Sequence, residues 1–185
     1  KWILEDKNQH DGSVIAPVLS FLEESDEVLP VAFPYFGNQE HDQQIFAHSD
    51  HDSILERKVP VRTLELAEGS VKVVTIFDLM LANYGLDRGL DDDQVASSYD
   101  DDIPYTPAWQ EQITGVKREQ IIQVAREFAE TAEKTKGRSM VILGAAINHW
   151  YNMDMTYRGI MNMLIMCGCV GKSGGGWAHY VGQEK

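Results

Sequence analysis

A long amphipathic stretch that runs directly into a short apolar run constrains the fold of this chain more than any other feature. Within residues 116–137, Ile121, Ala125 and Phe128 recur at spacings of four and three residues, which predicts a helix with one apolar face. Gly137 is expected to end this helix, because glycine is frequent just after a helix C-terminus.

The run SMVILGAA at 139–146 follows this helix at once and is apolar at nearly every position, as a buried parallel strand is. Next come a polar and aromatic segment at 147–158, expected as a loop or helix start, and an apolar helix over 157–168, predicted to be buried. The predicted order is helix, strand, loop, helix and glycine-rich loop. This order indicates an α/β layer with a ligand crevice at the carboxyl end of the strand.

The residues before this unit favour short β elements. Two prolines make 28–36 extended, because proline disfavours helix in the residue before it. Residues 59–76 predict a hairpin that turns within AEGS, and helices are expected over 77–85 and 106–115.

The expected fold class is α/β: a Rossmann-like parallel-sheet piece, preceded by an irregular β-rich segment with a hairpin. We expect residues 1–57 to be irregular, with short strands and polar loops, and residues 58–185 to form an α/β segment that lines part of a ligand crevice.

Composition excludes several classes of protein. The formal net charge of −13 argues against broad contact with nucleic acid, whose phosphates require Lys and Arg. No apolar run reaches the roughly 20 residues of a membrane-spanning helix, and the charged start is no signal peptide. The chain lacks an initiating Met and stops just after a dense motif, so we expect it to be a fragment of a longer chain.

The glycine-rich segment VGKSGGG, at 170–176, resembles a phosphate-binding P-loop only in part. That motif also requires a glycine where this chain has Met166, and it follows a strand, whereas this segment follows a predicted helix. Two interpretations stay open. The segment is a plain flexible loop, or it is a backbone surface that lies close to a ligand, with Lys172 and Ser173 beside a phosphate or polar heterocycle.

Three other clusters favour ordinary structural interpretations. The C-x-C pair Cys167 and Cys169 suits apolar packing at a helix end better than metal binding, and it is too small for a disulfide framework. AHSDHD, at 47–52, offers metal-ligand side chains but is best read as a solvated loop. The acidic runs at 91–93 and 100–102 are likewise predicted to be solvated loop surface.

The richest segment is GAAINHWYNMDMTYRG, at 144–159. The small residues Gly144, Ala145 and Ala146 would let the backbone at the end of the strand pack against a ligand. Donors and acceptors then crowd beside aromatic rings: Asn148, His149, Asn152, Asp154 and Arg158.

Two interpretations of these polar residues stay open. The first is a capped helix start, with Asn148 or Asn152 as the cap and an Asp154–Arg158 pair at i, i+4. The second is a polar wall for a pterin or nucleotide, with Arg158 on a phosphate and His149 donating to a ring or oxo group.

Several stretches resemble the respiratory nitrate reductase alpha subunits of the molybdopterin oxidoreductase family. NHWYNMDMTYRG (148–159) and CGCVGKSGGGWAHYVGQEK (167–185) carry the resemblance, with support from YTPAWQEQITGV (105–116) and DLMLANYGLDRG (78–89). The likeness is close from Val59 to Lys185 and looser over residues 1–57.

The resemblance implies a segment of a large oxidoreductase that reduces nitrate to nitrite at a molybdenum bis(molybdopterin guanine dinucleotide) centre. It also implies an iron–sulfur cluster with ligands outside this chain, an iron–sulfur beta subunit and a haem-containing gamma membrane subunit. The parent complex would associate with the membrane through these partners, facing the cytoplasm, or facing outward if the source is archaeal.

The resemblance places part of the cofactor crevice on this chain but no catalytic residue and no metal ligand, so the fragment alone is expected to be inactive. His179 and Gln183 would continue the same wall. The expected cofactor-binding residues are Gly144, Ala145, Asn148, His149, Arg158, Gly171, Lys172, Ser173, Gly174 and Gly175.

Two alternatives remain at this point. One keeps the family and changes the substrate to formate, selenate or a sulfur oxyanion. The other is a non-catalytic α/β module that binds a nucleotide or a protein partner and uses its glycines only for turns.

Overall fold

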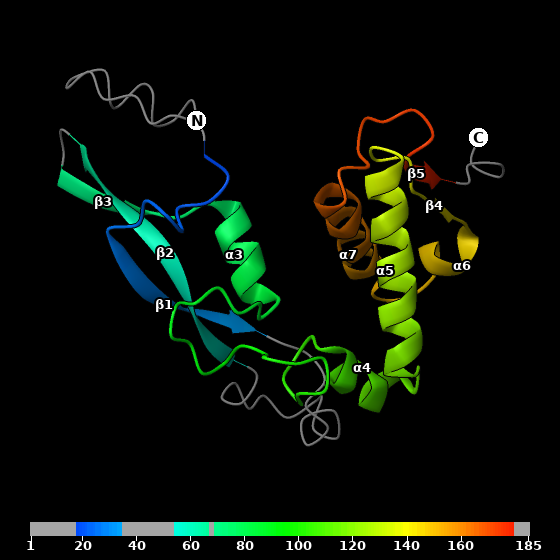
Figure 1. The fold of residues 1–185 in the computed structure, drawn as a ribbon, viewed down its shortest axis with the longest axis horizontal. Helices are drawn as coiled ribbons and strands as arrows, with labels where there is room; N and C mark the ends of the chain where they lie inside the picture. Colours follow the sequence, from blue (N-terminus) through cyan, green and yellow to red (C-terminus); the bar gives the residue numbers. More distant parts are fainter. Residues whose placement is uncertain (1–17, 35–53, 67–68, 180–185) are drawn as a thin grey trace. The chain divides into compact units, whose positions relative to one another are not determined.

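A computed structural model describes residues 18–34, 54–66 and 69–179 of the chain. The chain divides into two compact units, Lys1–Arg118 and Glu119–Lys185. The first unit is built on a three-stranded antiparallel sheet and the second on helices and a two-stranded parallel sheet, so the fold is mixed α/β (Figure 1).

The antiparallel sheet has the order β1-β2-β3, formed by β1 (Glu27–Pro34), β2 (Ile54–Leu66) and β3 (Gly69–Val73). β2 and β3 confirm the predicted hairpin, and β1 confirms that the proline-containing segment is extended. Proline is tolerated there because β1 lies at an edge of the described sheet, where one side of the strand needs no ladder hydrogen bond.

Helix α3 (Ile76–Asn83) packs on β2, and the apolar core of the unit lies between them. Val59, Val61 and Ala82 are buried at its centre. Five partly buried side chains pack around them: Leu29, Val31, Phe33, Val74 and Leu79. The predicted helix over 77–85 is confirmed.

A fully buried arginine holds the C-terminal end of α3. The guanidinium of Arg57 donates to the carbonyl oxygens of Ala82 (3.2 Å) and Asn83 (2.7 Å) at the end of the helix, and to that of Gln94 (2.7 Å). Burial lowers the pKa of Arg57, and Asp92 partly opposes this effect. Gly85 is in the left-handed region at φ +68°, and an added Cβ there would lie 2.6 Å from Nη2 of Arg57.

The N-terminal end of α3 carries a buried carboxylate, Asp78. Its oxygens accept hydrogen bonds from Ser20 Oγ (2.6 Å), Phe21 N (2.9 Å) and Thr75 Oγ1 (2.8 Å), and it pairs with Arg88 at 2.6 Å. Burial acts to raise the pKa of Asp78, but these hydrogen bonds outweigh it and the pKa is lowered. The network ties the chain at Ser20–Phe21 to α3.

Two acidic residues organise the loop between α3 and α4 (Pro107–Thr114). One oxygen of Asp101 accepts from the backbone N–H groups of Ser97 (2.8 Å) and Ser98 (2.9 Å), and Asp92 accepts from the backbone N–H of Lys58 (2.5 Å). The acidic runs lie in loops, as predicted, but Asp92 is not simply solvated, because it accepts a part-buried hydrogen bond from β2. The predicted helix over 106–115 is confirmed by α4.

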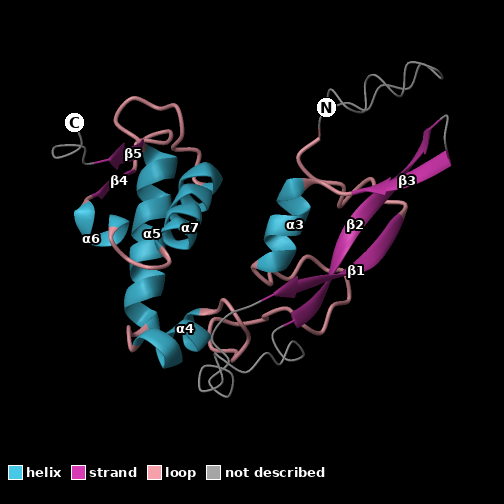
Figure 2. Cartoon of the chain, turned by 180° about the vertical axis from the view of Figure 1, so that it is seen from behind, coloured by secondary structure: helices cyan, strands magenta, loops and turns pink. Residues whose placement is uncertain are grey.

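The second unit contains α5 (Arg118–Lys134), β4 (Met140–Leu143), α6 (Ala145–Asn148), α7 (Met153–Met166) and β5 (Gly176–His179). β4 and β5 form a parallel pair (Figure 2).

The apolar core of the second unit joins Ala132 of α5, Leu164 of α7 and Cys169. Five partly buried residues complete it: Phe128, Val141, Ile160, Cys167 and Trp177. The predicted long helix is confirmed.

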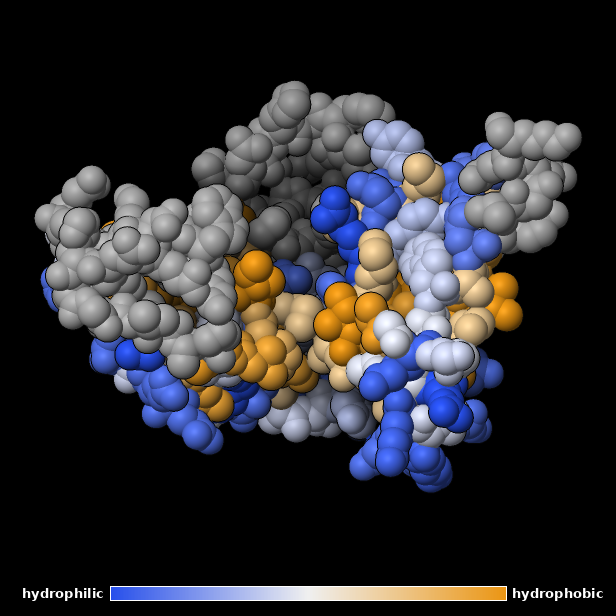
Figure 3. All heavy atoms as spheres, turned by 90° about the horizontal axis from the view of Figure 1, so that it is seen from above, coloured by the Kyte–Doolittle hydropathy of each residue, from blue (hydrophilic) through white to orange (hydrophobic). Residues whose placement is uncertain are grey.

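Two expectations for this unit are wrong within the described residues. β4 is not covered on both faces, since Met140 is 42% exposed and Ile142 is 76% exposed. α7 begins at Met153, earlier than expected, and Leu164 is its one fully buried residue. Apolar atoms reach the surface on the face that Figure 3 shows. The apolar residues that predicted a buried strand and a buried helix are therefore partly exposed in this unit.

In the described part of the chain, no helix has both the length and the apolar character needed to span a membrane.

Candidate functional site

The predicted site residues are arranged around the strand pair β4–β5. The parallel register aligns Met140 with Gly176 and Leu143 with His179. The glycine-rich loop therefore enters β5 at the amino end of the pair, whereas Gly144 leaves β4 at the carboxyl end. The structure separates the predicted residues into two groups, and it does not bring both groups to one end.

The group at the carboxyl end lies on α6 and the start of α7. Gly144 precedes α6 and is half-buried, and a Cβ added there would meet nothing within 4 Å. Ala145 and His149 are exposed, and His149 ends α6 by donating its backbone N–H to the carbonyl of Ile147. This end therefore offers open backbone and an accessible imidazole.

Two buried oxygen atoms in this group have no hydrogen-bond partner among the described residues. They are Oδ1 of Asn148, the last residue of α6, and the hydroxyl oxygen of Tyr157 in α7. Such atoms are uncommon in native proteins, because an unmet buried polar group costs about 1–3 kcal/mol. Any partners of these two oxygen atoms therefore lie outside the described residues.

Tyr157 belongs to a row of rings that covers β5. Its ring meets Trp177 edge-on at 4.9 Å between centroids, and Trp177 stacks with His179 at 6.4 Å. Tyr157 was not among the predicted site residues, although it lies in the richest polar segment. Tyr157 differs from the other aromatic residues of that segment only in its burial beside Trp177. Trp177 lies in β5, a strand that the sequence did not predict.

The alternative of a capped helix start fails for these polar side chains. Asn152 occupies the N-cap position of α7, but its side chain accepts no hydrogen bond from the helix. In the described part of the chain, Arg158 makes no ion pair with Asp154 and no side-chain hydrogen bond. Local helix capping therefore does not explain why these residues are concentrated here.

The group at the amino end is the turn Lys172–Gly175, closed by a hydrogen bond from the backbone N–H of Gly175 to the carbonyl of Lys172 (3.0 Å). It connects α7 to β5, a helix to a strand, which is the reverse of the strand–loop–helix order of a P-loop. Lys172 and Ser173 are exposed. Their side chains make no hydrogen bond or ion pair with other described residues.

The glycines in this turn and directly before it lack a side chain for different structural reasons. A Cβ on Gly175 would lie 2.0 Å from the carbonyl oxygen of Gly137, so tight backbone packing explains its lack of a side chain. Gly171 and Gly174 instead have positive φ angles of 74° and 83° and open space around an added Cβ. The left-handed backbone conformation therefore explains why these two residues are glycine.

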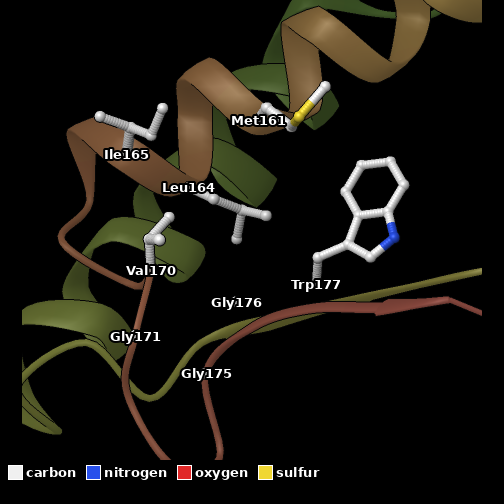
Figure 4. Close-up of a pocket in the computed structure, with 8 residues that line it drawn as sticks. All are labelled: Met161, Leu164, Ile165, Val170, Gly171, Gly175, Gly176 and Trp177. Carbon is white, nitrogen blue, oxygen red and sulfur yellow. The ribbon is translucent and has the colours of Figure 1, made fainter.

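An apolar hollow of about 520 Å³ lies beside this turn. Figure 4 shows Met161, Leu164 and Ile165 of α7 on one side of it, with Gly175, Gly176 and Trp177 along the other. Its lining carries no charged side chain, so the hollow does not suit an anion.

The two cysteines are packing residues. Cys169 is fully buried in the core, and burial, with a smaller effect of Cys169, raises the pKa of Cys167. No group of three or more His, Cys, Asp or Glu that could hold a metal ion occurs in the parts that the structure describes. The segment 47–52 and Gln183 lie outside those parts.

Comparison with known proteins identifies the family of this chain. The profile of the molybdopterin oxidoreductase family matches residues 6–182. Over the whole chain, the sequence is 57% identical to the respiratory nitrate reductase 1 alpha chain of Escherichia coli (strain K12) and 47% identical to the nitrate reductase alpha chain of Bacillus subtilis (strain 168). It is 30% identical, over 84% of its length, to the perchlorate reductase subunit alpha of Dechloromonas aromatica (strain RCB).

The chain spans about 15% of the length of the first relative and about 14% of the other two. The profile match and these identities cover both units of the structure, including the site groups at the two ends of the strand pair. The chain therefore belongs to the molybdopterin oxidoreductase family.

Proposed function

We propose that this chain is a segment of the alpha chain of a respiratory nitrate reductase, in which it forms part of the wall around the molybdenum cofactor. The observation that carries the proposal is the 57% identity along the whole chain to a respiratory nitrate reductase alpha chain. Identity falls to 30% for the relative named for perchlorate, which favours nitrate as the substrate.

The residues present fit a molybdopterin guanine dinucleotide. Asn148 and Tyr157 offer buried oxygen atoms that need partners, and Gly144 offers open backbone beside them. Arg158 and Lys172 are exposed cations without an anionic partner among the described residues, which suits the phosphates of a dinucleotide. A ligand of this length explains why site residues occur at both ends of the strand pair.

Each residue has a role in holding such a cofactor. The planar guanidinium of Arg158 can donate two hydrogen bonds to one phosphate, and the exposed N–H groups and lysine of the Lys172–Gly175 turn suit another. A ring N–H of His149 donates a hydrogen bond to a ring or oxo group of the cofactor. When bound, the cofactor supplies the two-electron chemistry that converts nitrate, with two protons, to nitrite and water.

The finer architecture follows from the same proposal. β4 and β5 are two strands of a larger Rossmann-like parallel sheet, and the exposed Met140 and Ile142 face parts of the complete alpha chain. Residues 58–185 form the crevice segment. The iron–sulfur cluster, the beta and gamma subunits and attachment to a membrane belong to the complete enzyme.

The test of the cofactor role is a matched pair of arginine variants in the complete alpha chain. Arg158→Gln removes the proposed phosphate contact, whereas Arg126→Gln removes an arginine from α5, outside the proposed crevice. We expect several-fold less molybdenum per polypeptide in the first variant only, measured by elemental analysis after purification. Equal molybdenum contents in the two variants would contradict this role of Arg158.

The test of the substrate is oxidation of reduced viologen by the complete enzyme. Nitrate is expected to be the preferred acceptor over perchlorate and selenate, and formate is expected not to be oxidised. A preference for perchlorate would instead favour a second candidate function, perchlorate reduction, which the similarity to the perchlorate reductase subunit alpha of Dechloromonas aromatica suggests. A molybdenum-free but fully folded enzyme would instead favour a non-catalytic module.

A further inference from the structure

The proposed function leaves the apolar hollow beside β5 unused. The hollow measures about 520 Å³, within the roughly 300–1,000 Å³ range of small-molecule pockets. Met161, Leu164 and Ile165 come from one face of α7, because they are three and four residues apart. Figure 4 shows Trp177 of β5 on the opposite side of the hollow. The hollow is therefore enclosed by a helix face and a strand of the second unit.

The hollow is continuous with the apolar core of the second unit. Leu164 is 1% exposed and Trp177 is partly buried, and both belong to that core as well as to the lining of the hollow. Protein interiors are close-packed and contain few voids larger than a water molecule. A void of this size that opens from a core indicates that the atoms completing the packing lie outside the described residues.

The outer lining of the hollow exposes large apolar side chains. Ile165 is 59% exposed and Val170 is 61% exposed, and Met161 is also exposed. Adjoining apolar side chains that are exposed in this way mark a surface that another structure covers. The same three side chains would gain most from such a cover, because burial of apolar area is favourable.

The lining gives a free small ligand little to bind. Ligand pockets combine apolar walls with a few polar groups that fix the orientation of the ligand. Here the side chains are aliphatic or thioether groups, apart from the indole of Trp177, and the other lining residues are glycines. A side chain that belongs to a polypeptide needs no such polar group, because its own backbone holds it in place. The lining therefore suits aliphatic or aromatic side chains.

We propose that this hollow is a socket for aliphatic or aromatic side chains from another part of the alpha chain, beyond residues 1–185. The inference rests on the proposed function, under which most of the polypeptide lies outside this segment, since the chain spans about 15% of the relative from Escherichia coli. Interfaces between separate subunits have a polar rim, whereas the exposed side chains that line this hollow are apolar. This difference favours the same polypeptide over the beta subunit as the occupant.

The first experiment measures how fast a maleimide modifies a cysteine placed at the hollow. Val170→Cys is compared with Lys134→Cys, whose native side chain is exposed on α5, in the complete alpha chain purified without the beta subunit. Peptide mass spectrometry follows each introduced cysteine. We expect Val170→Cys to react at least about tenfold more slowly than Lys134→Cys in the native chain, and equally fast after denaturation.

The other occupants give different results in the same experiment. Equal native rates for the two variants would mean that the hollow is open, which overturns the proposal. Protection of Val170→Cys that requires added beta subunit would assign the hollow to a subunit interface, and protection that increases with alpha-chain concentration would assign it to a second copy. Either result also overturns the proposal.

A buried charge tests the socket without labelling. Val170→Asp is compared with Gln120→Asp, which changes an exposed residue in the first turn of α5. In the complete alpha chain, Val170→Asp should lower the midpoint of thermal unfolding by several degrees, because its carboxylate would lie among apolar side chains. If this variant does not fold, the nearly isosteric Val170→Thr should lower the midpoint by less. Midpoints at Val170 that equal that of Gln120→Asp would contradict the socket.

Two further readouts separate the inference from the proposed function. Molybdenum content and the oxidation of reduced viologen by nitrate are measured on the same preparations. Rapid labelling of Val170→Cys in a molybdenum-loaded enzyme that reduces nitrate would refute the socket and leave the proposed function standing. A folded wild-type alpha chain without molybdenum would refute the proposed function itself.

Discussion

Replacing Gly175 by alanine tests whether the glycine-rich loop is shaped by packing or by a ligand. The new Cβ would lie 2.0 Å from the carbonyl oxygen of Gly137 and 3.1 Å from that of Cys169, and both are backbone atoms. Because ordinary contact needs about 3.4 Å or more, the loop must move by about 1.4 Å. Movement would strain the hydrogen bond from Gly176 N to the carbonyl of Ser139, at 2.9 Å, and the start of β5.

The expected loss of stability follows from these contacts. Overpacking typically costs 1–3 kcal/mol, and a weakened buried hydrogen bond adds about 1 kcal/mol, so Gly175→Ala should cost about 3 kcal/mol. Gly174→Ala meets no atom within 4 Å but must keep φ near +83°, which costs about 1–2 kcal/mol. Gly174→Asn should cost less, because asparagine tolerates this conformation.

The assay is urea unfolding of the three variants, followed by circular dichroism, together with hydrogen exchange of the β5 amides. We expect the order of destabilisation Gly175→Ala, then Gly174→Ala, then Gly174→Asn, with the largest loss of protection at Trp177 and Ala178 in the first. If Gly175→Ala costs no more than Gly174→Ala, the packing explanation for Gly175 is wrong.

Two further predictions concern the first unit. Asp78→Asn should cost about 3 kcal/mol, because Arg88 would be left without its carboxylate. Since the pKa of Asp78 is lowered on folding, its stabilisation is present above pH ~4 and is lost as the pH falls through the lowered value. As the pH is lowered from 6 to 2, the urea midpoint should fall less steeply in Asp78→Asn than in the wild type. An equal slope in both proteins would show that Asp78 does not cause this pH dependence. Gly85→Ala should cost about 2 kcal/mol or more by straining the backbone and displacing Arg57, whereas a neutral result would show that Arg57 can reposition freely.

Local sequence signals predicted much of the secondary structure. The hairpin of β2 and β3, the helices α3, α4 and α5 and the strand β4 follow from periodicity, turn residues and helix-ending glycines, all of which act over a few neighbouring residues. The same reading selected Asn148 and the polar residues around it. It treated Asp92 as solvated surface, because the backbone N–H of Lys58 that Asp92 binds is distant in the sequence and becomes a neighbour only in the folded chain.

The sequence by itself determined the family, the order of elements and the two segments, 144–158 and 171–175, that carry the polar and glycine-rich character of the site. Only the tertiary structure decided how those segments relate. β5 is four residues long, and its pairing with β4 spans the whole of α7, so no local pattern could place the two segments at opposite ends of one strand pair. Burial of the Tyr157 hydroxyl, the separate reasons for Gly174 and Gly175, and the Asp78 network likewise depend on contacts between distant residues, which packing creates and local propensity does not encode.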